Sequence, residues 1–586
     1  MFLKKSRYKN GRTFLSIVES YRDDSGTPKH RIIKKIGYLD ELTSLYDDPI
    51  AHFSNEAKIM TQEKKEESSL SIVLDLNEAI DNGLNLYNVG YIAYKYIYNE
   101  LALSQFFLNK QRNLNISFSL DKCLQLLVFS RILYPSSKKS TFDNKNIFFE
   151  QFNNLTLDSI YDSLDYFNKY KKEIQALLWE KTKDSYQRDV SKSYYDCTNY
   201  YFDIEYNDDD IIDDEGNVIE KGLRKRGPEK NHRPDPIVEM GLLMDATGIP
   251  MAYDIFPGNE SEKLSLRPIL KKTKADFGIE RTIVVADRGL NTSDNIFFLA
   301  GKNNDADKKK DGYVYGQSVR GADKEFKNWV LDSEGYKVDI VENNVAFIHK
   351  SRVYAKEIRI NKDGKRNVKV NVCQKQMVYF SFKYLLKQRN DRNKMIKKAQ
   401  DMIKNPGAYT RATSYGAANY IENISYDKKT GEIIDKELFL DKEKIAEEEK
   451  YDGYYSIVTS EIELDDYEIR KIYRGLAKIE NTFKVTKSYL GTRPAFVWTK
   501  EHIEGHFLTC FVALVIVRLL ERKLNYKYTV EQIIESTKQY SCINIDKNIY
   551  QFIYNDNIIN DIGKAFDIEL DKKYRKKEKI KKLLKY

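Results

Sequence analysis

Three residues of types that bind phosphate or metal recur at seven-residue intervals near the C-terminal end of the chain: Tyr473, Glu480 and Lys487. Seven residues are about two turns of an α-helix, so a helix projects all three side chains along one stripe, which Lys484 joins. One carboxylate among amines on a rigid helix could bind a metal ion that in turn binds a polyphosphate. The alternative is a solvated helix face with ion pairs between successive turns.

A second stripe on the same segment predicts how that helix packs. Its members are apolar and recur at the intervals of a core-facing surface, about 100° away from the first stripe. They are Ile472, Leu476, Ile479, Phe483 and Leu490. One face of the helix therefore packs against the protein, and the neighbouring face presents Glu480 and the amines.

Two further carboxylates belong to predicted strands. Asp196 lies in a strand over residues 193–202, where alternation puts it on one face together with Thr198. Asp287 follows the apolar run 282–286 and so comes at the carboxyl end of a strand, where open α/β sheets place their ligands. Together with Glu480, these acids come from three separate segments that can meet at one edge of a sheet.

Such a carboxylate cluster predicts a metal-dependent phosphodiester reaction. Two unit charges about 4 Å apart repel by about 4 kcal/mol at an effective dielectric constant near 20, so the cluster needs cations. Oxygen ligands without neighbouring Cys or His favour Mg²⁺ or Mn²⁺. Two such ions activate an attacking water or hydroxyl and stabilise the leaving oxygen, while Lys484 and Lys487 hold the phosphates of DNA. Taken singly, each acid is more often a cap, a turn residue or a surface charge.

The elements that must position these acids follow a recognisable order. Strands are predicted over residues 193–202, 236–245, 249–257, 282–286 and 313–319, with helices over 264–277 and from about residue 292. Three antiparallel strands followed by strands that alternate with helices are the element order of the RNase H-like fold. The fold class is therefore α+β and multidomain, with a mixed α/β catalytic core.

The rest of the chain is expected to form separate modules. We expect a basic β module (1–40), a linker (41–71), a helical DNA-binding domain (72–186), the first part of the core (187–320), a β-rich insertion with a basic helix (321–460), the second part of the core with the Glu480 helix (461–525), and a C-terminal helical region with a basic tail (526–586). A turn signal at residues 23–28 predicts a hairpin in the first module.

Composition and charge limit the class of protein. The five cysteines form no C-x-x-C pair, and the N-terminus has no apolar signal core, so a reducing cytoplasm is expected. The longest apolar run, 507–520, contains Arg518 and is too short for a membrane span. The net charge of +9 is concentrated at the ends of the chain, in residues 1–36 and 572–586. This distribution is typical of a protein that binds the phosphate backbone of nucleic acid. Solubilising tails are the alternative.

Some weaker signals have competing interpretations. His502 and His506 lie four residues apart on a helix with Glu504 between them, an H-x-E-x-H order that differs from the H-E-x-x-H of metalloproteases, so packing or phosphate contact is favoured over a zinc site. Trp329 could stack on an unpaired DNA base or be buried in a core. Asp245 and Asp452 lie beside glycines, and turn chemistry accounts for both.

At this point the chain resembles the DDE transposases of bacterial insertion sequences that carry a Y-x2-R-x3-E-x6-K signature. Tyr473, Glu480 and Lys487 match the Tyr, Glu and Lys of that signature, whereas Leu476 occupies its Arg position and Arg474 lies two residues earlier. The resemblance extends over residues 195–198, 240–245, 256–259, 286–289, 451–453, 493–494 and 503–506.

The resemblance implies a function as well as a fold. Asp196, Asp287 and Glu480 become the catalytic ligands of two Mg²⁺ or Mn²⁺ ions, in an RNase H-like core with a β-rich insertion between the last two acids. The expected partners are the terminal inverted repeats and target DNA, bound by a homodimer in the bacterial cytoplasm. Expected DNA contacts are Tyr473, Arg474, Lys484, Lys487, Arg288 and Trp329. A non-catalytic DNA-binding derivative and a nuclease without strand transfer are the alternatives.

Overall fold

A computed structural model divides the chain into two compact units, Met1–Gly83 and Leu84–Tyr586. It describes residues 1–8, 11–22, 28–68, 86–228, 235–301, 310–341, 345–362, 365–411, 413–434, 437–546 and 548–585. The predicted turn at residues 23–28 lies almost entirely outside the described residues. We describe the two units separately.

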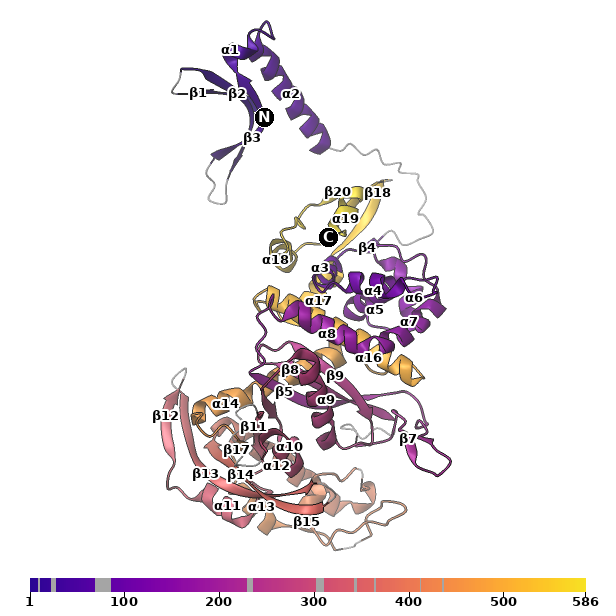
Figure 1. Ribbon diagram of the computed structural model, residues 1–586. Coiled ribbons are helices and arrows are strands. Elements are labelled where there is room, and N and C mark those ends of the chain that lie inside the picture. The colour runs from indigo at the N-terminus through magenta and orange to yellow at the C-terminus, as the bar shows by residue number, and fades with distance from the viewer. Residues whose placement is uncertain are drawn as a thin grey trace. The chain divides into compact units, whose positions relative to one another are not determined.

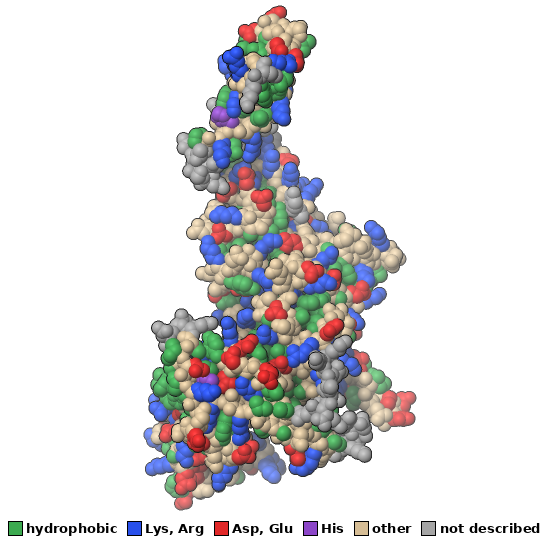
Figure 2. Space-filling model, turned by 60° about the vertical axis from the view of Figure 1, so that its left-hand side comes forward, with side chains coloured by type: hydrophobic (Ala, Val, Ile, Leu, Met, Phe, Trp, Pro, Cys, Tyr) green, Lys and Arg blue, Asp and Glu red, His purple; other side chains and the backbone are tan. Residues whose placement is uncertain are grey.

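The N-terminal unit is a three-stranded antiparallel sheet with two helices. The strands β1 (Phe2–Arg7), β2 (Thr13–Arg22) and β3 (Pro28–Tyr38) pair in that order, and α1 (Leu39–Leu42) and α2 (Pro49–Ser68) follow. Leu15, Leu42 and Phe53 form the small core. Figure 2 shows Lys and Arg side chains spread over the visible face of this unit.

The segment predicted as a linker is largely helical, which corrects that prediction. In α2, Phe53 and Ala57 are buried, and Thr61 accepts a hydrogen bond from the N-terminal amine of Met1 at 2.8 Å. Lys34 of β3 forms an ion pair with Glu56 at 2.6 Å. Only a few apolar residues of α2 pack against the sheet, and the rest of its sequence is polar. The polar pattern therefore predicts no helix, and α2 is stabilised by its tertiary contacts.

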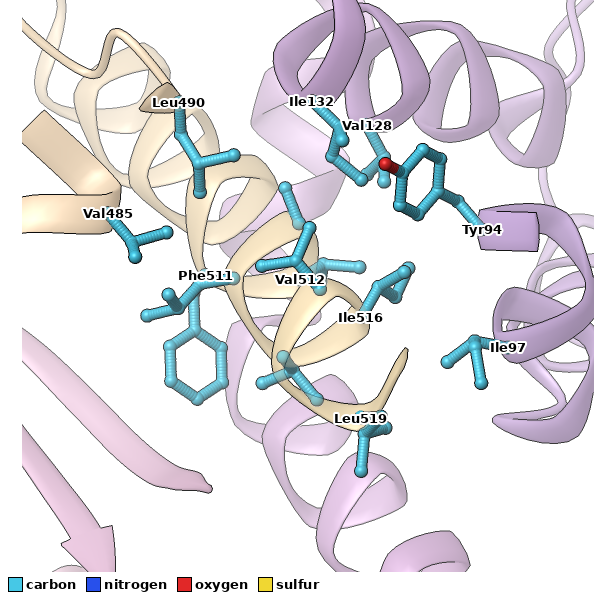
Figure 3. Packing of buried hydrophobic residues seen from close by; sticks show 14 of the residues in the cluster. Tyr94, Ile97, Val128, Ile132, Val485, Leu490, Phe511, Val512, Ile516 and Leu519 are labelled. Carbon is cyan, nitrogen blue, oxygen red and sulfur yellow. The ribbon is translucent and has the colours of Figure 1, made fainter. Parts of the chain in front are cut away.

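The second unit begins with a helical region built around one apolar helix, α16 (Lys500–Lys523). It packs against α3 (Ile92–Glu100), α5 (Leu120–Leu133), α7 (Leu157–Lys169) and α8 (Lys171–Thr182), while α4 (Leu103–Gln111) and α6 (Lys138–Asp143) pack on α5 and α7. Figure 3 shows Tyr94 and Val128 pointing toward Val512 and Ile516. The most apolar stretch of α16 is entirely buried, so this membrane-length helix is a core helix.

A nine-stranded sheet forms the centre of the second unit. Its order is β12-β13-β14-β17-β11-β10-β5-β8-β9. The five strands predicted from the sequence are β5 (Lys192–Tyr201), β8 (Ile237–Asp245), β9 (Pro250–Pro257), β10 (Ile283–Ala286) and β11 (Gly312–Gln317). The strands β5, β8 and β9 are antiparallel, whereas β10 runs parallel to both β5 and β11. Figure 1 shows α9 (Glu262–Phe277) and α10 (Ser293–Ala300) beside this sheet.

Four strands of the predicted insertion widen this sheet, and β15 (Ile421–Glu422) and β16 (Phe439–Leu440) form a separate two-stranded sheet. The strand β17 (Tyr454–Thr459) pairs with both β11 and β14 (Lys365–Phe380), which continues the sheet through β13 (Val345–Lys362) to β12 (Lys337–Val341). The predicted basic helix is α12 (Phe382–Lys404), accompanied by α11 (Lys324–Leu331) and α13 (Lys442–Glu449).

The C-terminal region contains a sheet, where only helices were predicted. The strands β18 (Ser541–Asp546), β19 (Ile549–Phe552) and β20 (Tyr574–Lys576) combine with β4 (Leu86–Asn88), and α17 (Val530–Gln539), α18 (Asn557–Ala565) and α19 (Lys577–Leu583) accompany them. The basic tail is folded, because Arg575, Ile580 and Leu584 are buried while the lysines between them face outward.

Candidate active site

Asp196 and Asp287 lie next to each other on neighbouring parallel strands. Val285 of β10 is opposite Tyr194 of β5, so two residues further along Asp287 comes level with Asp196. Adjacent strands are about 4.8 Å apart. Residues two positions apart share a face, so both carboxylates lie on the face of Tyr194 and Val285, which belong to the large apolar cluster. The pairing predicted from the sequence is therefore present in the backbone.

The segment that carries Glu480 crosses this same face of the sheet. It consists of α14 (Asp466–Arg474), α15 (Leu476–Lys484) and a π-helical turn, η6 (Val485–Tyr489). Three side-chain contacts tie it to β5: Tyr194 donates to the Ile472 carbonyl (3.1 Å), the Tyr200 and Thr486 hydroxyls share a hydrogen bond (2.7 Å), and Lys487 donates to Thr198. In the sequence, Glu480 comes between the first and the last of these contacts on the helical segment, as Asp196 does on β5.

Tyr473 links Glu480 to Asp287. Burial raises the pKa of Tyr473 well above its usual value, and the negative charges of Asp287 and Glu480 raise it further, while Arg288 opposes them. The hydroxyl therefore stays protonated at any physiological pH and is available as a donor. Both carboxylates raise the pKa of the same phenol, so Tyr473 lies within electrostatic range of Asp287 on the sheet and of Glu480 on its own helical segment.

Gly316 allows Tyr473 to come this near to the sheet. Because Ala286 pairs with Tyr315, Gly316 is level with Asp287 on the next strand, β11. A Cβ atom at position 316 would lie 2.4 Å from the Tyr473 hydroxyl oxygen and 3.2 Å from the Arg288 nitrogen. Only glycine leaves room for the phenol there. Nothing in the sequence around this glycine marks it as part of the site.

The carboxylate oxygens themselves are not gathered into a ready metal site. Asp196 accepts a hydrogen bond from the Cys197 amide at 2.8 Å, and Asp287 accepts one from the Gly289 amide at 2.7 Å. Over the described part of the chain, no three His, Cys, Asp or Glu side chains stand close enough to hold one ion. The Cys197 thiol belongs to the apolar cluster on the opposite face, which leaves oxygen donors only.

A hollow of about 400 Å³ opens beside the row of Asp196, Asp287 and Gly316. Arg288, Gly316 and Tyr473 form one wall. The other walls come from β17, α12 and the chain after β11, and they combine aromatic and cationic side chains: Arg320, Tyr384, Lys387, Arg392, Tyr454 and Tyr455. The sequence predicted α12 as a basic helix, but nothing in it indicated that these residues converge.

Asp452 holds one wall of this hollow together. Arg392 donates two hydrogen bonds to its carboxylate at 2.7 Å, and Arg320 donates a third at 2.6 Å. The carboxylate of Asp452 and the guanidinium of Arg392 are both almost completely buried. Turn chemistry was predicted for Asp452, and the structure replaces it with a buried ionic role.

For Asp245 the turn prediction is confirmed. Its carboxylate accepts hydrogen bonds from the amides of Thr247 and Ile249, both at 3.0 Å, in the turn between β8 and β9. Arg188 adds a buried ion pair at 2.5 Å. Asp245 therefore fixes the turn and belongs to the frame of the sheet.

Trp329 lies away from the hollow. It stacks on Phe326 with ring centres 5.7 Å apart, inside a separate apolar cluster, and the cationic groups of Lys350 and Arg352 cover it at 4.9 and 4.7 Å. Of its two interpretations, packing is the one that these contacts support.

The two histidines of α16 serve different partners. His506 Nδ1 is 2.7 Å from the Lys138 amine in the interior, and His502 forms an ion pair with Asp165 at 3.4 Å. These separate contacts favour packing over the zinc site.

The signature residues around Glu480 divide between the two faces of the helical segment. Leu476 packs on the large apolar cluster, so the position where the signature has Arg faces the core. Arg474 is exposed and acts electrostatically on Arg470 and Tyr379, on the side of β14. The amine of Lys484 is exposed and lies 5.8 Å from the Tyr489 ring centre.

Two models of known protein families match the chain. Residues 3–71 match the N-terminal domain of IS1634 family transposases, and residues 226–516 match the transposase DDE domain. The search of curated proteins finds no match. The DDE match contains Asp287, Glu480 and the hollow, and Asp196 lies before it in β5. DDE transposases are phosphoryl-transfer enzymes that typically depend on divalent metal. The chain belongs to the IS1634 family of insertion-sequence transposases and carries their DDE catalytic domain.

Proposed function

We propose that Asp196, Asp287 and Glu480 are the catalytic acids of this transposase and hold two Mg²⁺ or Mn²⁺ ions. The observation that supports this most is the level position of Asp196 and Asp287 on adjacent strands, with the Glu480 helix crossing the same face. The strand order β11-β10-β5-β8-β9, with three antiparallel strands and two parallel ones, supports an RNase H-like core. When bound, the ions supply charge that activates the attacking oxygen and stabilises the leaving one.

The residues around the acids would hold the DNA strand. Tyr473 keeps its proton, so it donates a hydrogen bond to a phosphate oxygen beside Asp287. Lys487, next to Thr198, and Lys484, one turn after Glu480, place positive charge along the same line. Arg288 extends this line of positive charge toward the hollow, and Arg474 extends it toward β14. Water attacks first at the ends of the element, and the freed 3′-OH then attacks target DNA.

The substrates and the assembly are part of the same proposal. The substrates are the terminal inverted repeats of the element and target DNA, in the bacterial cytoplasm. Two copies of the chain pair the two ends. The exposed strand cations of the N-terminal unit and the basic helix α12 provide further contacts to phosphate.

Single substitutions of the acids test the assignment. With DNA that carries the element ends and Mg²⁺, Asp287→Ala and Glu480→Ala should lower strand cleavage by about a thousandfold or more and leave end binding within about threefold. Glu501→Ala, an exposed acid in the first turn of α16, is the matched control and should cleave normally. Normal cleavage by Asp287→Ala would falsify the assignment.

A second assay separates the alternatives. Pre-cut element ends are mixed with a supercoiled target plasmid and Mg²⁺. Joined products support strand transfer, as proposed. Cleavage of intact ends without joining indicates a nuclease, and binding without either reaction indicates a non-catalytic derivative.

A further inference from the structure

A folded arm leaves the sheet at the end of β5, the strand that carries Asp196. The arm comprises residues 203–222 and contains β6 (Ile211–Ile212) and β7 (Val218–Glu220), which form a two-stranded sheet of their own. Figure 1 shows the β7 hairpin projecting from the body of the sheet. The arm therefore continues directly from the backbone of the candidate active site.

Hydrogen bonds hold the arm at both ends, so it is an ordered element. At its base, Asp208 accepts from the Arg224 amide at 2.9 Å and from the Arg224 side chain at 2.7 Å. At its tip, Asp213 accepts from the amides of Glu215 and Asn217 at 3.0 and 2.7 Å. An arm that is fixed in shape can dock with little loss of conformational entropy.

The arm exposes large apolar side chains that it has no means of burying. The exposed fractions are 78% for Tyr206, 57% for Ile211, 60% for Ile212, 50% for Val218 and 68% for Ile219. A lone pair of strands covers neither of its own faces. Contiguous exposed apolar surface on a folded protein marks an interaction site.

An aromatic residue extends this surface at the base of the arm. Trp498 is 66% exposed, and the guanidinium of Arg224 lies 5.8 Å from its ring centre. Tryptophan is among the residue types that contribute most to protein–protein binding. We call the arm together with Trp498 the arm surface.

The charge of the arm indicates what it binds. Residues 203–220 contain nine acids and no base, whereas the rest of the chain carries a net +18 by difference from the total of +9. DNA phosphates are repelled by such an arm. A positively charged protein surface attracts it and gains from covering its apolar side chains. A second copy of this chain carries such charge on the exposed lysines and arginines of β3 and α12.

We propose that the arm surface of one copy docks on a second copy of the chain and is the contact that pairs two transposases. The role in pairing rests on the proposed function, but the docking does not require DNA or metal. Because the arm follows β5, docking also connects the partner copy to the strand of Asp196.

Sedimentation of the full chain without DNA tests the docking. At low salt and concentrations of 5–50 µM, the wild-type chain should form dimers, and dimerisation should weaken as salt is raised, on the order of tenfold for each threefold increase. The variant I211S/I212S/V218S/I219S should weaken dimerisation at least tenfold. The charge reversal D209K/D214K/E215K, at three exposed acids, should do the same.

A matched variant controls for the loss of apolar surface in general. V338S/I340S removes two exposed residues of β12, with exposed fractions of 62% and 68%, and should dimerise like the wild type. All variants should unfold thermally within about 2 °C of the wild type, because the changed side chains are exposed. A monomeric wild-type chain at 50 µM, or arm variants that dimerise normally, overturns the proposal. A failure of DNA cleavage would leave this result unaffected.

Discussion

Gly316 determines how near Tyr473 comes to the sheet beside Asp287, so Gly316→Ala should damage the proposed active site without changing any of the three proposed acids. The added methyl group would lie 2.4 Å from the Tyr473 hydroxyl oxygen. Overpacking of this kind costs about 1–3 kcal/mol, and a displacement of about 1 Å near the chemistry can lower the rate about a hundredfold. Cleavage rate and thermal unfolding measure the two effects.

The double variant Gly316→Ala/Tyr473→Phe checks the cause. Removing the hydroxyl removes the shortest contact, so the double variant should recover more than half of the stability lost by Gly316→Ala. Gly407→Ala is the control, because an added Cβ there meets nothing within 4 Å. If the two substitutions add independently, Tyr473 is not the group that Gly316 accommodates.

Because Lys138 is buried, we expect the free energy of unfolding to depend on pH near neutrality. Burial, helped by the charge of Arg131, lowers the pKa of this amine to about 7, and the adjacent His506 has its pKa held well below the usual value. In the unfolded chain Lys138 keeps its proton up to a pH of about 10, whereas in the folded chain it loses that proton near pH 7. Between pH 7 and about 10 the folded state therefore binds fewer protons than the unfolded state. Stability should therefore rise with pH above 7, by up to about 1.4 kcal/mol per pH unit.

Replacing the buried amine tests this origin. Lys138→Met should be more stable than the wild type at pH 7 and should lack this contribution to the rise between pH 7 and 9, as measured by urea unfolding. Lys139→Met, at the exposed neighbouring position, should keep the wild-type profile. An unchanged slope in Lys138→Met would assign the pH dependence to other groups.

At the scale of elements, local patterns predicted most of the catalytic sheet. Strands β5, β8, β9, β10 and β11 were all anticipated, because alternation or a short apolar run marks each of them. The pairing of these strands with those of the insertion was not anticipated. Strand β17 lies between β11 and β14, about 140 residues after β11 in the chain, and no local pattern encodes a partner so distant.

The same limit explains what was missed elsewhere. Helix α2 and strands β18 to β20 are held by a few tertiary contacts and have no strong apolar period, so the sequence reads as a linker and a tail. The three proposed acids could be singled out because their residue types restrict the chemistry, and their catalytic role stays a prediction. The aromatic and cationic walls of the hollow could not, since Tyr384, Arg392 and Tyr455 are individually ordinary.

Helix α12 is attached to the sheet through Asp452, and this gives an element-scale prediction. Asp452→Asn keeps the shape of the side chain but leaves the guanidinium groups of Arg320 and Arg392 without their shared anion. Removing one partner of a buried ion pair costs about 3–5 kcal/mol. The midpoint of thermal unfolding should fall accordingly, and the hollow beside Tyr473 should lose its fixed wall.

The neighbouring acid Asp391 provides the comparison. Asp391 is exposed, and its ion pair with Lys394, at 4.0 Å, is long and solvated. Asp391→Asn should therefore change the free energy of unfolding by less than about 0.5 kcal/mol. Equal effects of the two substitutions would show that the buried arginines do not depend on Asp452.

At the scale of the whole molecule, the chain divides into two compact units, and we propose that the first captures DNA while the second, with the DDE domain, performs catalysis. The N-terminal unit has its own core of Leu15, Leu42 and Phe53, so residues 1–83 should fold alone and give the circular dichroism of a mixed sheet and helix. The large unit contains the complete DDE match, so residues 84–586 should cleave DNA ends, but with weaker binding.

The charge of the first unit lies mainly on its strands, and salt dependence can locate the DNA contact there. Lys29 and Arg31 are exposed on β3, whereas Lys58 is exposed on α2. Each phosphate contact contributes a slope of about −0.9 in log K against log salt concentration. For the fragment 1–83 with double-stranded DNA, K29E/R31E should reduce the slope by about two, because both cations lie on the sheet, and K58E should leave it unchanged. A larger effect of K58E would place the DNA on the helix side of this unit instead.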